Sequence, residues 1–318
     1  MKSYNWGILG TGNIAGKFVE GLQFVKDANI YAVASRTKAK ALDFANKYHV
    51  QIAYGTYQDM IDDKFVDIIY IATTNNLHYE NTLMCLNAGK AVLCEKPFTL
   101  RVSQLQEMID LAYSKKIFLM EALWSRFLPT IEKVITLIES GAIGEPHIIK
   151  ADFGFKAQYS SESRLFNSLL GGGSVLDIGI YPLFLSLLLF GKSLSIKALS
   201  INAQTGTDIT TGMIIIHPKE RMSILASSFA VPLETKAEIV GTDGTITLHR
   251  MFHMPTTISI TKDGKTKKIP IKIKGNGYNY EAEEVMKCIS QGKIESTKLP
   301  LSFSLELMKM IDTVLNHE

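Results

Sequence analysis

The spacing of hydrophobic residues changes near residue 145 and divides the chain into two parts. Before this point, short runs rich in Val, Ile and Ala alternate with segments whose apolar residues recur at helical spacing. The runs are YNWGILG, NIYAVAS, VDIIYIAT, KAVLCE and KIFLMEA. The helical segments are Asn13–Val25, Lys38–Tyr48, Leu77–Ala88 and Ser103–Ser114, the last with Ser103 as its expected N-cap. This alternation predicts a parallel sheet with helices on both faces.

The second part begins with a glycine-rich turn and an apolar helix over 171–190, and strands follow. These strands are SIKALSINAQ, DITTGMIIIHP, RMSILASSFAV, AEIVGTDGTITLH and TTISITKDGKTKKIPI. The dipeptides Asp243-Gly244 and Asp263-Gly264 predict hairpin turns, so this sheet is expected to be mostly antiparallel. Two further helices are predicted over Tyr280–Ser290 and Ser302–Leu315.

The junction of the first strand and first helix carries Gly10-x-Gly12-x-x-Ala15. In this pattern the first glycine permits a tight turn, the second lets a pyrophosphate approach the backbone, and the small third residue lets the helix pack closely. The turn therefore predicts a dinucleotide site, although a simple tight turn is the alternative. The candidate cofactor-binding residues here are Gly10, Thr11, Gly12, Asn13 and Ile14.

The predicted fold class is α/β: an N-terminal Rossmann domain with a doubly wound parallel sheet, then a C-terminal α+β domain with an open, mostly antiparallel sheet. A chain of 318 residues suggests two domains. We place a nucleotide-binding domain at 1–122 and a substrate-binding and oligomerisation domain at 123–318, with a C-terminal helix that packs back on the first domain.

Composition excludes several classes of protein. With 46% apolar residues and a net charge of only +3, nucleic acid is not the expected partner. Cys85, Cys94 and Cys288 show no paired spacing, which argues against a disulfide framework or a metal site and fits a reducing compartment. The N-terminus has no pattern of a secretory signal, and the longest apolar run, YPLFLSLLLF, is too short to span a membrane. We expect a cytoplasmic protein.

The end of the second strand predicts the type of dinucleotide. An NAD site usually has Asp or Glu there for the ribose hydroxyls. Here Ser35, Arg36 and Lys40 follow the strand, and they favour the 2′-phosphate of NADP, with NAD as the weaker alternative. A solvated helix start is the other interpretation of these charges.

Polar side chains also follow the third of the predicted strands. Thr73, Thr74 and Asn75 lie at its carboxyl end, where ligands bind in open α/β sheets. His78 comes in the next helical turn and joins the candidate cofactor-binding residues. A helix cap is an equally good interpretation of Asn75 or Asn76, and a structural role is the commoner one for a lone histidine.

The sequence resembles the Gfo/Idh/MocA family of glucose–fructose oxidoreductase-like dehydrogenases in the order and spacing of four motifs. These are the glycine turn, the triplet EKP, GGGSVLDIGIY and the C-terminal YNYEAEEVMKCISQGKIES. The resemblance covers nearly the whole chain. It implies an NAD(P)-binding Rossmann domain, hydride transfer to or from a sugar-like or polyol substrate, and oligomers formed through the open sheet.

The resemblance also implies roles for the EKP triplet. Lys96 would contact the reacting hydroxyl or carbonyl, and Glu95 would lie beside the nicotinamide. A cis Lys96–Pro97 bond is expected, since X–Pro is the common setting for cis peptides.

One departure from the family pattern is informative, because Tyr181 stands where many relatives have histidine. Together with MEALWSRFLP, this is similar to the dimeric dihydrodiol dehydrogenase subgroup and its NADP-dependent aldose dehydrogenase relatives. That resemblance implies proton transfer by Tyr181 with Lys96, and a cleft lined by Trp124 and Arg126. Asp177, four residues before the tyrosine, would orient it or the substrate. Core packing is the alternative for Tyr181, Trp124 and Arg126.

The leading hypothesis is an NADP-dependent oxidoreductase that acts on an alcohol or carbonyl group of a sugar, polyol or trans-dihydrodiol. Lys96 and Tyr181 would form its proton-transfer pair, because a nearby ammonium favours the phenolate. The alternative is a non-catalytic NADP(H)-binding sensor or regulatory protein. We expect a homodimer or homotetramer.

Overall fold

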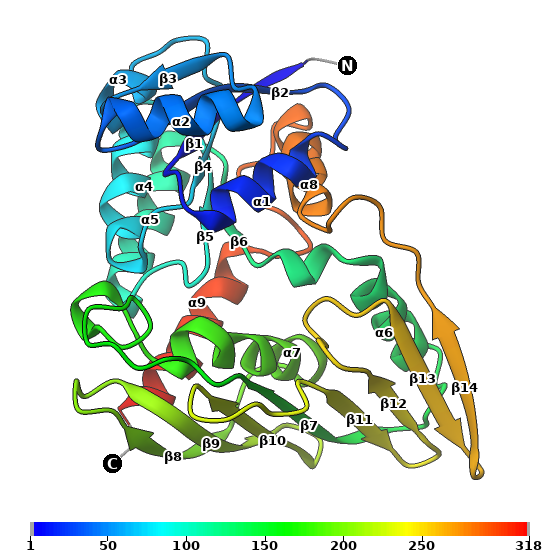
Figure 1. Ribbon diagram of the computed structural model, residues 1–318. Coiled ribbons are helices and arrows are strands. Elements are labelled where there is room, and N and C mark those ends of the chain that lie inside the picture. The colour runs from blue at the N-terminus through cyan, green and yellow to red at the C-terminus, as the bar shows by residue number, and fades with distance from the viewer. Residues whose placement is uncertain (1–2, 317–318) are drawn as a thin grey trace. The chain divides into compact units, whose positions relative to one another are not determined.

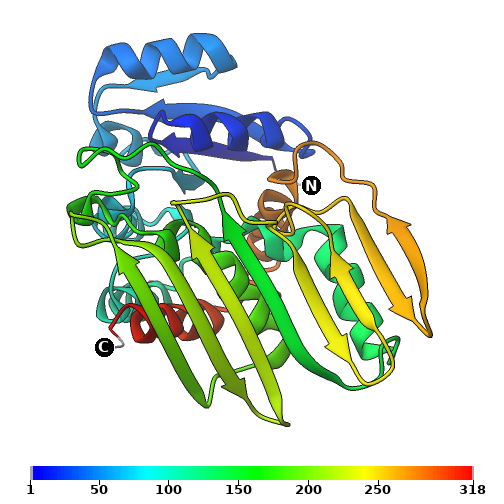
Figure 2. The same cartoon turned by 60° about the horizontal axis from the view of Figure 1, so that its bottom comes forward.

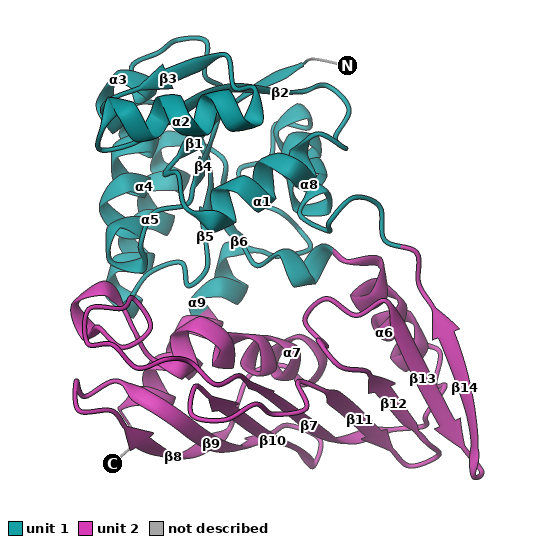
Figure 3. Ribbon diagram, in the orientation of Figure 1, with its two compact units in different colours: residues 1–127, 273–305 teal, residues 128–272, 306–318 magenta. Residues whose placement is uncertain are grey.

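The chain divides into two compact units in the computed structural model, which describes residues 3–316. Unit 1 contains residues 1–127 and 273–305, and unit 2 contains residues 128–272 and 306–318 (Figure 3). The expectation that the N-terminus holds no signal segment rests partly on residues 1 and 2, which lie outside the described residues.

Unit 1 is built around a parallel sheet with the strand order β3-β2-β1-β4-β5-β6, as predicted (Figure 1). Its strands are β1 (Tyr4–Leu9), β2 (Ala28–Ala34), β3 (Ile52–Tyr54), β4 (Ile68–Ile71), β5 (Ala91–Glu95) and β6 (Leu119–Ala122). Its helices are α1 (Asn13–Leu22), α2 (Lys38–Tyr48), α3 (Tyr57–Ile61), η1 (Asn75–Leu77), α4 (His78–Asn87), α5 (Val102–Lys115), η2 (Trp124–Phe127) and α8 (Asn279–Ser290). The central strands are continuous apolar runs, because helices cover both faces of the sheet.

Two details of unit 1 differ from the sequence prediction. The short β3 and α3 were not predicted, so the strand before Thr73 is the fourth along the chain and not the third. Ser103 is not an N-cap, because α5 begins at Val102 with Arg101 as its N-cap. A C-terminal helix was expected to pack back on the first domain, and α8 lies in unit 1, where it packs against α1 and η2.

Unit 2 contains a second sheet, with the strand order β14-β13-β12-β11-β7-β10-β9-β8. The strands are β7 (Pro146–Gly154), β8 (Ser195–Asn202), β9 (Asp208–His217), β10 (Arg221–Ser228), β11 (Ala237–Gly241), β12 (Thr245–Leu248), β13 (Thr257–Lys262) and β14 (Lys265–Pro270). The sheet is mostly antiparallel, as predicted, and β7 pairs with β10 in parallel. Both predicted hairpins are present. At the second, Asp263 and Gly264 have φ of 49° and 71°, the left-handed conformation that a two-residue hairpin loop requires.

One face of this second sheet is covered by helices and the other is open (Figure 2). The helices are α6 (Pro129–Glu139), the 3₁₀ turn η3 (Ser168–Leu170), the π-helix η4 (Val175–Gly179), α7 (Ile180–Phe190) and the C-terminal part of α9 (Leu301–Leu315). Helix α6 was not predicted, although Pro129 at its first position is a common start signal.

The apolar helical segment Ser168–Phe190 is long and hydrophobic enough to cross a membrane by length and composition. However, 83% of its most apolar window is buried within the protein. We therefore assign it to the core, where α7 contacts β7 and β10.

Candidate active site

The glycine turn lies between β1 and α1, at the carboxyl edge of the parallel sheet. Gly10 has φ of +112°, and a Cβ there would lie 2.6 Å from the carbonyl oxygen of Ala72, so only glycine fits. Gly12 is exposed, and a Cβ there would meet nothing within 4 Å. The space above Gly12 and the N-terminus of α1, with Asn13 and Ile14 in its first turn, therefore suit a pyrophosphate.

The residues expected to select the dinucleotide surround the end of β2. Ser35 is buried, and the Thr11 hydroxyl donates a hydrogen bond to its Oγ at 3.4 Å, which joins the glycine turn to this strand end. Arg36 and Lys40 are exposed. Burial raises the pKa of the Tyr57 phenol, and the neighbouring Arg36 guanidinium opposes that effect.

The polar residues after β4 form a compact turn. The Asn81 amide donates to Thr73 Oγ1 at 3.1 Å, and Thr74 Oγ1 donates to Asn76 Oδ1 at 2.7 Å. Neither Asn75 nor Asn76 caps α4, because the N-cap of that helix is Leu77. The side chains thus lie at the expected sheet edge, with Thr73 and Thr74 already bonded to neighbouring residues.

His78 connects two loops at this edge. Its Nδ1 lies 2.8 Å from the Pro97 carbonyl oxygen and its Nε2 lies 3.2 Å from that of Thr73. Burial lowers the pKa of His78, and a neutral imidazole has one N–H, so it donates to one carbonyl at a time. These contacts give the side chain a structural role beside the predicted cofactor site.

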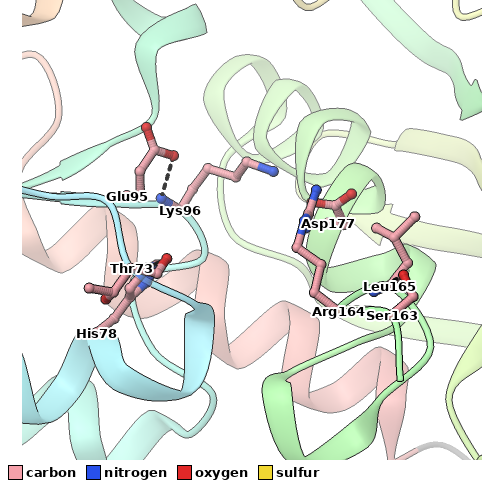
Figure 4. A network of polar contacts seen from close by, with 8 residues as sticks. All are labelled: Thr73, His78, Glu95, Lys96, Ser163, Arg164, Leu165 and Asp177. Carbon is pink, nitrogen blue, oxygen red and sulfur yellow. Dashed lines mark hydrogen bonds and ion pairs between the residues drawn. The ribbon is translucent and has the colours of Figure 1, made fainter. Parts of the chain in front are cut away.

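The EKP triplet ends β5, and the Lys96–Pro97 peptide bond is cis, as expected. The backbone N–H of Lys96 donates to Glu95 Oε2 at 3.2 Å (Figure 4). On the other side of the proline, the Phe98 N–H donates to Glu121 Oε1 at 3.1 Å. The loop that carries Lys96 is therefore held by buried groups at both ends.

Sequence reasoning missed a group of buried acidic residues behind this loop. The Tyr70 hydroxyl donates to Glu95 Oε1, and burial holds the pKa of that tyrosine well above its usual value. Burial, and then the charge of Glu95, raise the pKa of Glu281 in α8 well above its usual value. No hydrogen-bond partner for either carboxyl oxygen of Glu281 is found among residues 3–316. We infer that Glu281 is protonated, as a buried carboxyl without a cation should be.

Trp124 and Arg126 lie in η2, within unit 1. The Trp124 ring stacks on Tyr278 with centroids 4.4 Å apart and planes 9° apart. Arg126 Nε donates to the Lys298 carbonyl oxygen at 2.9 Å. Both side chains are buried, so these contacts agree with the packing alternative, and their proposed place in a cleft stays a prediction.

In unit 2, Asp177 lies in the π-helix η4 and Tyr181 near the start of α7, so α-helical spacing does not set their relation. Arg164 Nη1 contacts Asp177 Oδ1 at 3.0 Å, and Figure 4 shows the arginine reaching it from the preceding loop. Sequence reasoning missed Arg164, and nothing in its neighbourhood along the chain marks it.

The phenol ring of Tyr181 is enclosed by aromatic side chains. His253 lies 5.0 Å and Phe153 lies 5.8 Å from it between ring centroids, and these two stack at 4.5 Å. Both neighbours were missed because they come from distant segments of the chain. Tyr181 is thus buried, with the rings of Phe153 and His253 beside it.

Neither a metal-binding cluster nor an activated cysteine is found among residues 3–316. Within residues 3–316, no group of three or more His, Cys, Asp or Glu side chains is placed to hold a metal ion. The three cysteines are buried and free, and burial raises the pKa of each thiol, so none is an activated nucleophile.

The sheet order, the open Gly12 and the lysine at the carboxyl edge define a dinucleotide-binding oxidoreductase with a separate α+β unit. The chain belongs to the Gfo/Idh/MocA family. The family model described as an oxidoreductase with an NAD-binding Rossmann fold matches residues 4–123, and the model of the family's C-terminal domain matches residues 131–247. It is thus a nicotinamide-dependent dehydrogenase or reductase that acts on CH–OH groups.

Relatives of known activity cover nearly the whole chain. A trans-1,2-dihydrobenzene-1,2-diol dehydrogenase from Xenopus laevis is 35% identical, over 98% of this chain and 96% of its own. The human enzyme of the same name is 33% identical, over 97% of this chain and 95% of its own.

Two of the solved structures that share the fold are oxidoreductases. One is a 3-ketoreductase from Actinomadura kijaniata in complex with NADP and TDP-benzene (TM-score 0.90, 21% identity, coverage 99% and 98%). The other is an aldose-aldose oxidoreductase from Caulobacter crescentus complexed with glycerol (TM-score 0.91, 23% identity, coverage 98% and 96%).

The buried Glu121 predicts a pH-dependent stability. Burial raises the pKa of Glu121 to about 7 from 4.5. The folded protein therefore binds the Glu121 proton more tightly than the unfolded chain does. The stabilisation that results is complete below the ordinary pKa of 4.5 and is lost as the pH rises through about 7. Glu121→Gln should remove this loss, which is about 1.4 kcal/mol per pH unit across the window. The free energy of urea unfolding, compared at about pH 5 and about pH 8, measures it.

The exposed Glu20→Gln in α1 is the matched control and should follow the wild-type pH dependence. If Glu121→Gln and the wild type lose stability equally over this range, Glu121 is ionised in the folded protein and the prediction is wrong.

Proposed function

We propose that the protein is an NADP-dependent oxidoreductase that transfers a hydride between the nicotinamide and an alcohol or carbonyl carbon of a sugar, polyol or trans-dihydrodiol. The observation that carries the proposal is the carboxyl edge of the parallel sheet, where the open glycine turn and the Lys96 loop follow β1 and β5. The full-length similarity to dihydrodiol dehydrogenases supports the substrate class.

The proton is handled by Lys96 and Tyr181, a pair that the similarity to dihydrodiol dehydrogenases supports. When bound, the nicotinamide supplies or accepts the hydride. In the direction of reduction, the Tyr181 hydroxyl donates its proton to the carbonyl oxygen of the substrate. The Lys96 ammonium stabilises the resulting phenolate, since an ordinary phenol with a pKa of about 10 is a poor proton carrier at neutral pH. Asp177 orients the substrate or the tyrosine, and its contact with Arg164 limits its rotation.

The preference for NADP is proposed from the end of β2. Ser35 and the exposed Arg36 supply a hydroxyl and a fork of N–H donors, and no carboxylate is present at these positions to repel a 2′-phosphate. Lys40, in the first turn of α2, adds positive charge. NADP is also the cofactor held by the 3-ketoreductase of similar fold.

The non-catalytic sensor finds no support, because the matching family model and the named relatives are oxidoreductases. A screen of NADP⁺ reduction against aldoses, inositols and trans-dihydrodiols tests the proposed substrate class. Binding of NADPH without a change of absorbance for any of these substrates would contradict that class.

The open sheet face in unit 2 is proposed to form a homodimer, or a homotetramer that contains this dimer. Its exposed apolar side chains are, with their exposed fractions, Leu199 (85%), Ile201 (64%), Ile214 (48%), Ile216 (37%) and Ile224 (42%). They lie on the neighbouring strands β8, β9 and β10, and Ile214 and Ile224 are directly paired. Exposed Lys197 and Lys150 lie on the same face, paired with Ile214 and Ile224. A group of exposed apolar side chains with polar neighbours of this kind marks an interface, and a second copy of the same face is its natural complement. We also propose a cytoplasmic location, since the free cysteines need a reducing environment.

Replacement of either proton-transfer residue tests the mechanism. Lys96→Met and Tyr181→Phe should each lower kcat by about 10²-fold or more, the scale of lost acid–base catalysis. Binding of NADPH, followed by its fluorescence, should stay near wild type, because neither change removes a phosphate contact. Lys115→Met, an exposed lysine at the end of α5, is the control. Near-normal turnover of Lys96→Met or Tyr181→Phe would remove that residue from the mechanism.

Arg36→Ala tests the cofactor preference. Loss of one charge-assisted hydrogen bond, about 1.5–3 kcal/mol, should raise KM for NADP⁺ by roughly 10- to 100-fold. KM for NAD⁺, which has no 2′-phosphate, should change little. Lys47→Ala, exposed at the other end of α2, is the matched control. The proposal fails if the variant changes both KM values equally, or if the wild type prefers NAD⁺.

Ile214→Lys tests the oligomer, because it replaces a central apolar side chain of the open face by a charge beside the existing Lys197. Light scattering after size exclusion should show a dimer or tetramer for the wild type and a smaller species for the variant. Leu42→Lys, at an exposed apolar position in unit 1, should keep the wild-type mass. A monomeric wild type would contradict the proposal.

A further inference from the structure

A buried carboxylate in unit 2, Asp208 at the start of β9, has no role in the proposed chemistry and is only 6% exposed. Its Oδ2 accepts hydrogen bonds from the Ser174 hydroxyl at 2.7 Å and from the backbone N–H of Val175 at 2.8 Å. The Thr211 hydroxyl adds a longer bond at 3.3 Å. Three donors thus converge on one oxygen, an arrangement that suits a charged acceptor.

These donors belong to the start of the π-helix that precedes Tyr181. Ser174 is the N-cap of η4 and Val175 is its first residue. Ser174 Oγ also lies 2.8 Å from Ser227 Oγ on β10, so the turn is attached to two strands of the sheet. A π-helix is a rare conformation, and it is stable only where the surrounding structure fixes it.

Gly173 brings the backbone close enough for these bonds. Its φ is +123°, and a Cβ there would lie 2.2 Å from Asp208 Oδ1. The same glycine donates its N–H to the Leu165 carbonyl oxygen at 2.9 Å. Arg164, the neighbour of Leu165, is the residue that contacts Asp177. The carboxylate therefore lies against the start of the π-helix, and Gly173 connects this turn to the loop that reaches Asp177.

We propose that Asp208 is a positioning residue of the reaction, which holds the turn of residues 173–179 against β9 and so determines where Asp177 and Tyr181 lie. The inference rests on the proposed function of Tyr181. Burial raises the pKa of Asp208, and its hydrogen bonds from Ser174 and Val175 oppose that effect. Asp208 thus occupies a position where burial disfavours the charged form of its carboxyl group.

Asp208→Leu and Asp208→Asn test the role, because both are close in size to aspartate and only asparagine keeps an acceptor oxygen. Asp208→Leu should lower kcat by about tenfold or more, since a misplacement of roughly 1 Å can cost about 10²-fold. Asp208→Asn should recover kcat to within about threefold of wild type, because its amide oxygen still accepts the hydrogen bonds, although more weakly. The Kd for NADPH should be unchanged in both. Hydrogen exchange of the amides in residues 174–181 should be faster in Asp208→Leu and near wild type in Asp208→Asn.

Ser186→Ala is the matched control. Ser186 lies further along α7 and is bonded to His217 Nε2 at 2.9 Å and Ser223 Oγ at 2.7 Å, so its loss weakens the same helix away from the turn. It should lower stability but leave kcat and the exchange of residues 174–181 near wild type. If Asp208→Leu does not fold, Ser174→Ala replaces it and should lower kcat more than Ser186→Ala does.

Two results would overturn the inference: unchanged exchange of residues 174–181 in Asp208→Leu, or kcat reduced equally in the Asp208 or Ser174 variant and in Ser186→Ala. Failure of the proposed function looks different, because Tyr181→Phe would then be active while the exchange of the turn still responds to Asp208.

Discussion

The loop after β5 carries Lys96 at the end of a strand that is buried on both faces. The neighbouring elements of unit 1 must therefore supply hydrogen-bond partners for this loop. The backbone groups of this loop are buried and need partners, since an unpaired buried group costs about 1–3 kcal/mol. The Tyr70 hydroxyl and the Lys96 N–H bond Glu95, a His78 nitrogen lies against the Pro97 carbonyl, and Glu121 accepts the next N–H. The loop is therefore limited to one conformation by partners from four elements.

Unit 2 uses the same physical arrangement for its own candidate residue. There Asp208 accepts the backbone N–H of Val175, as Glu121 accepts that of Phe98. In each unit a buried carboxyl group accepts a backbone N–H in the segment that precedes or follows a proposed proton-transfer residue. Buried acids are poor contributors to stability, because removal from water disfavours their charge. Their presence at these two places is better explained by the need to position backbone.

The sequence predicted most of the regular structure, and its errors have physical causes. Short apolar runs that alternate with segments of helical spacing predicted the parallel sheet of unit 1, and the dipeptide Asp263-Gly264 predicted a hairpin of the second sheet, because both signals are local. The short strand β3 was missed, since three residues are too few to show a period. Ser103 was wrongly chosen as a cap because serine is a common N-cap, yet the helix starts one residue earlier.

What the sequence determined by itself was the class of site: a glycine turn after a strand, a lysine at a strand end and basic residues in place of an acid. Each of these is a short segment whose chemistry depends on neighbours in the chain. Only the tertiary structure decided which groups surround them, as with Glu281 behind Glu95, Asp208 beneath Val175 and His253 against Tyr181. These partners are far apart in sequence, and burial and hydrogen bonding between distant segments leave no periodic pattern in the chain.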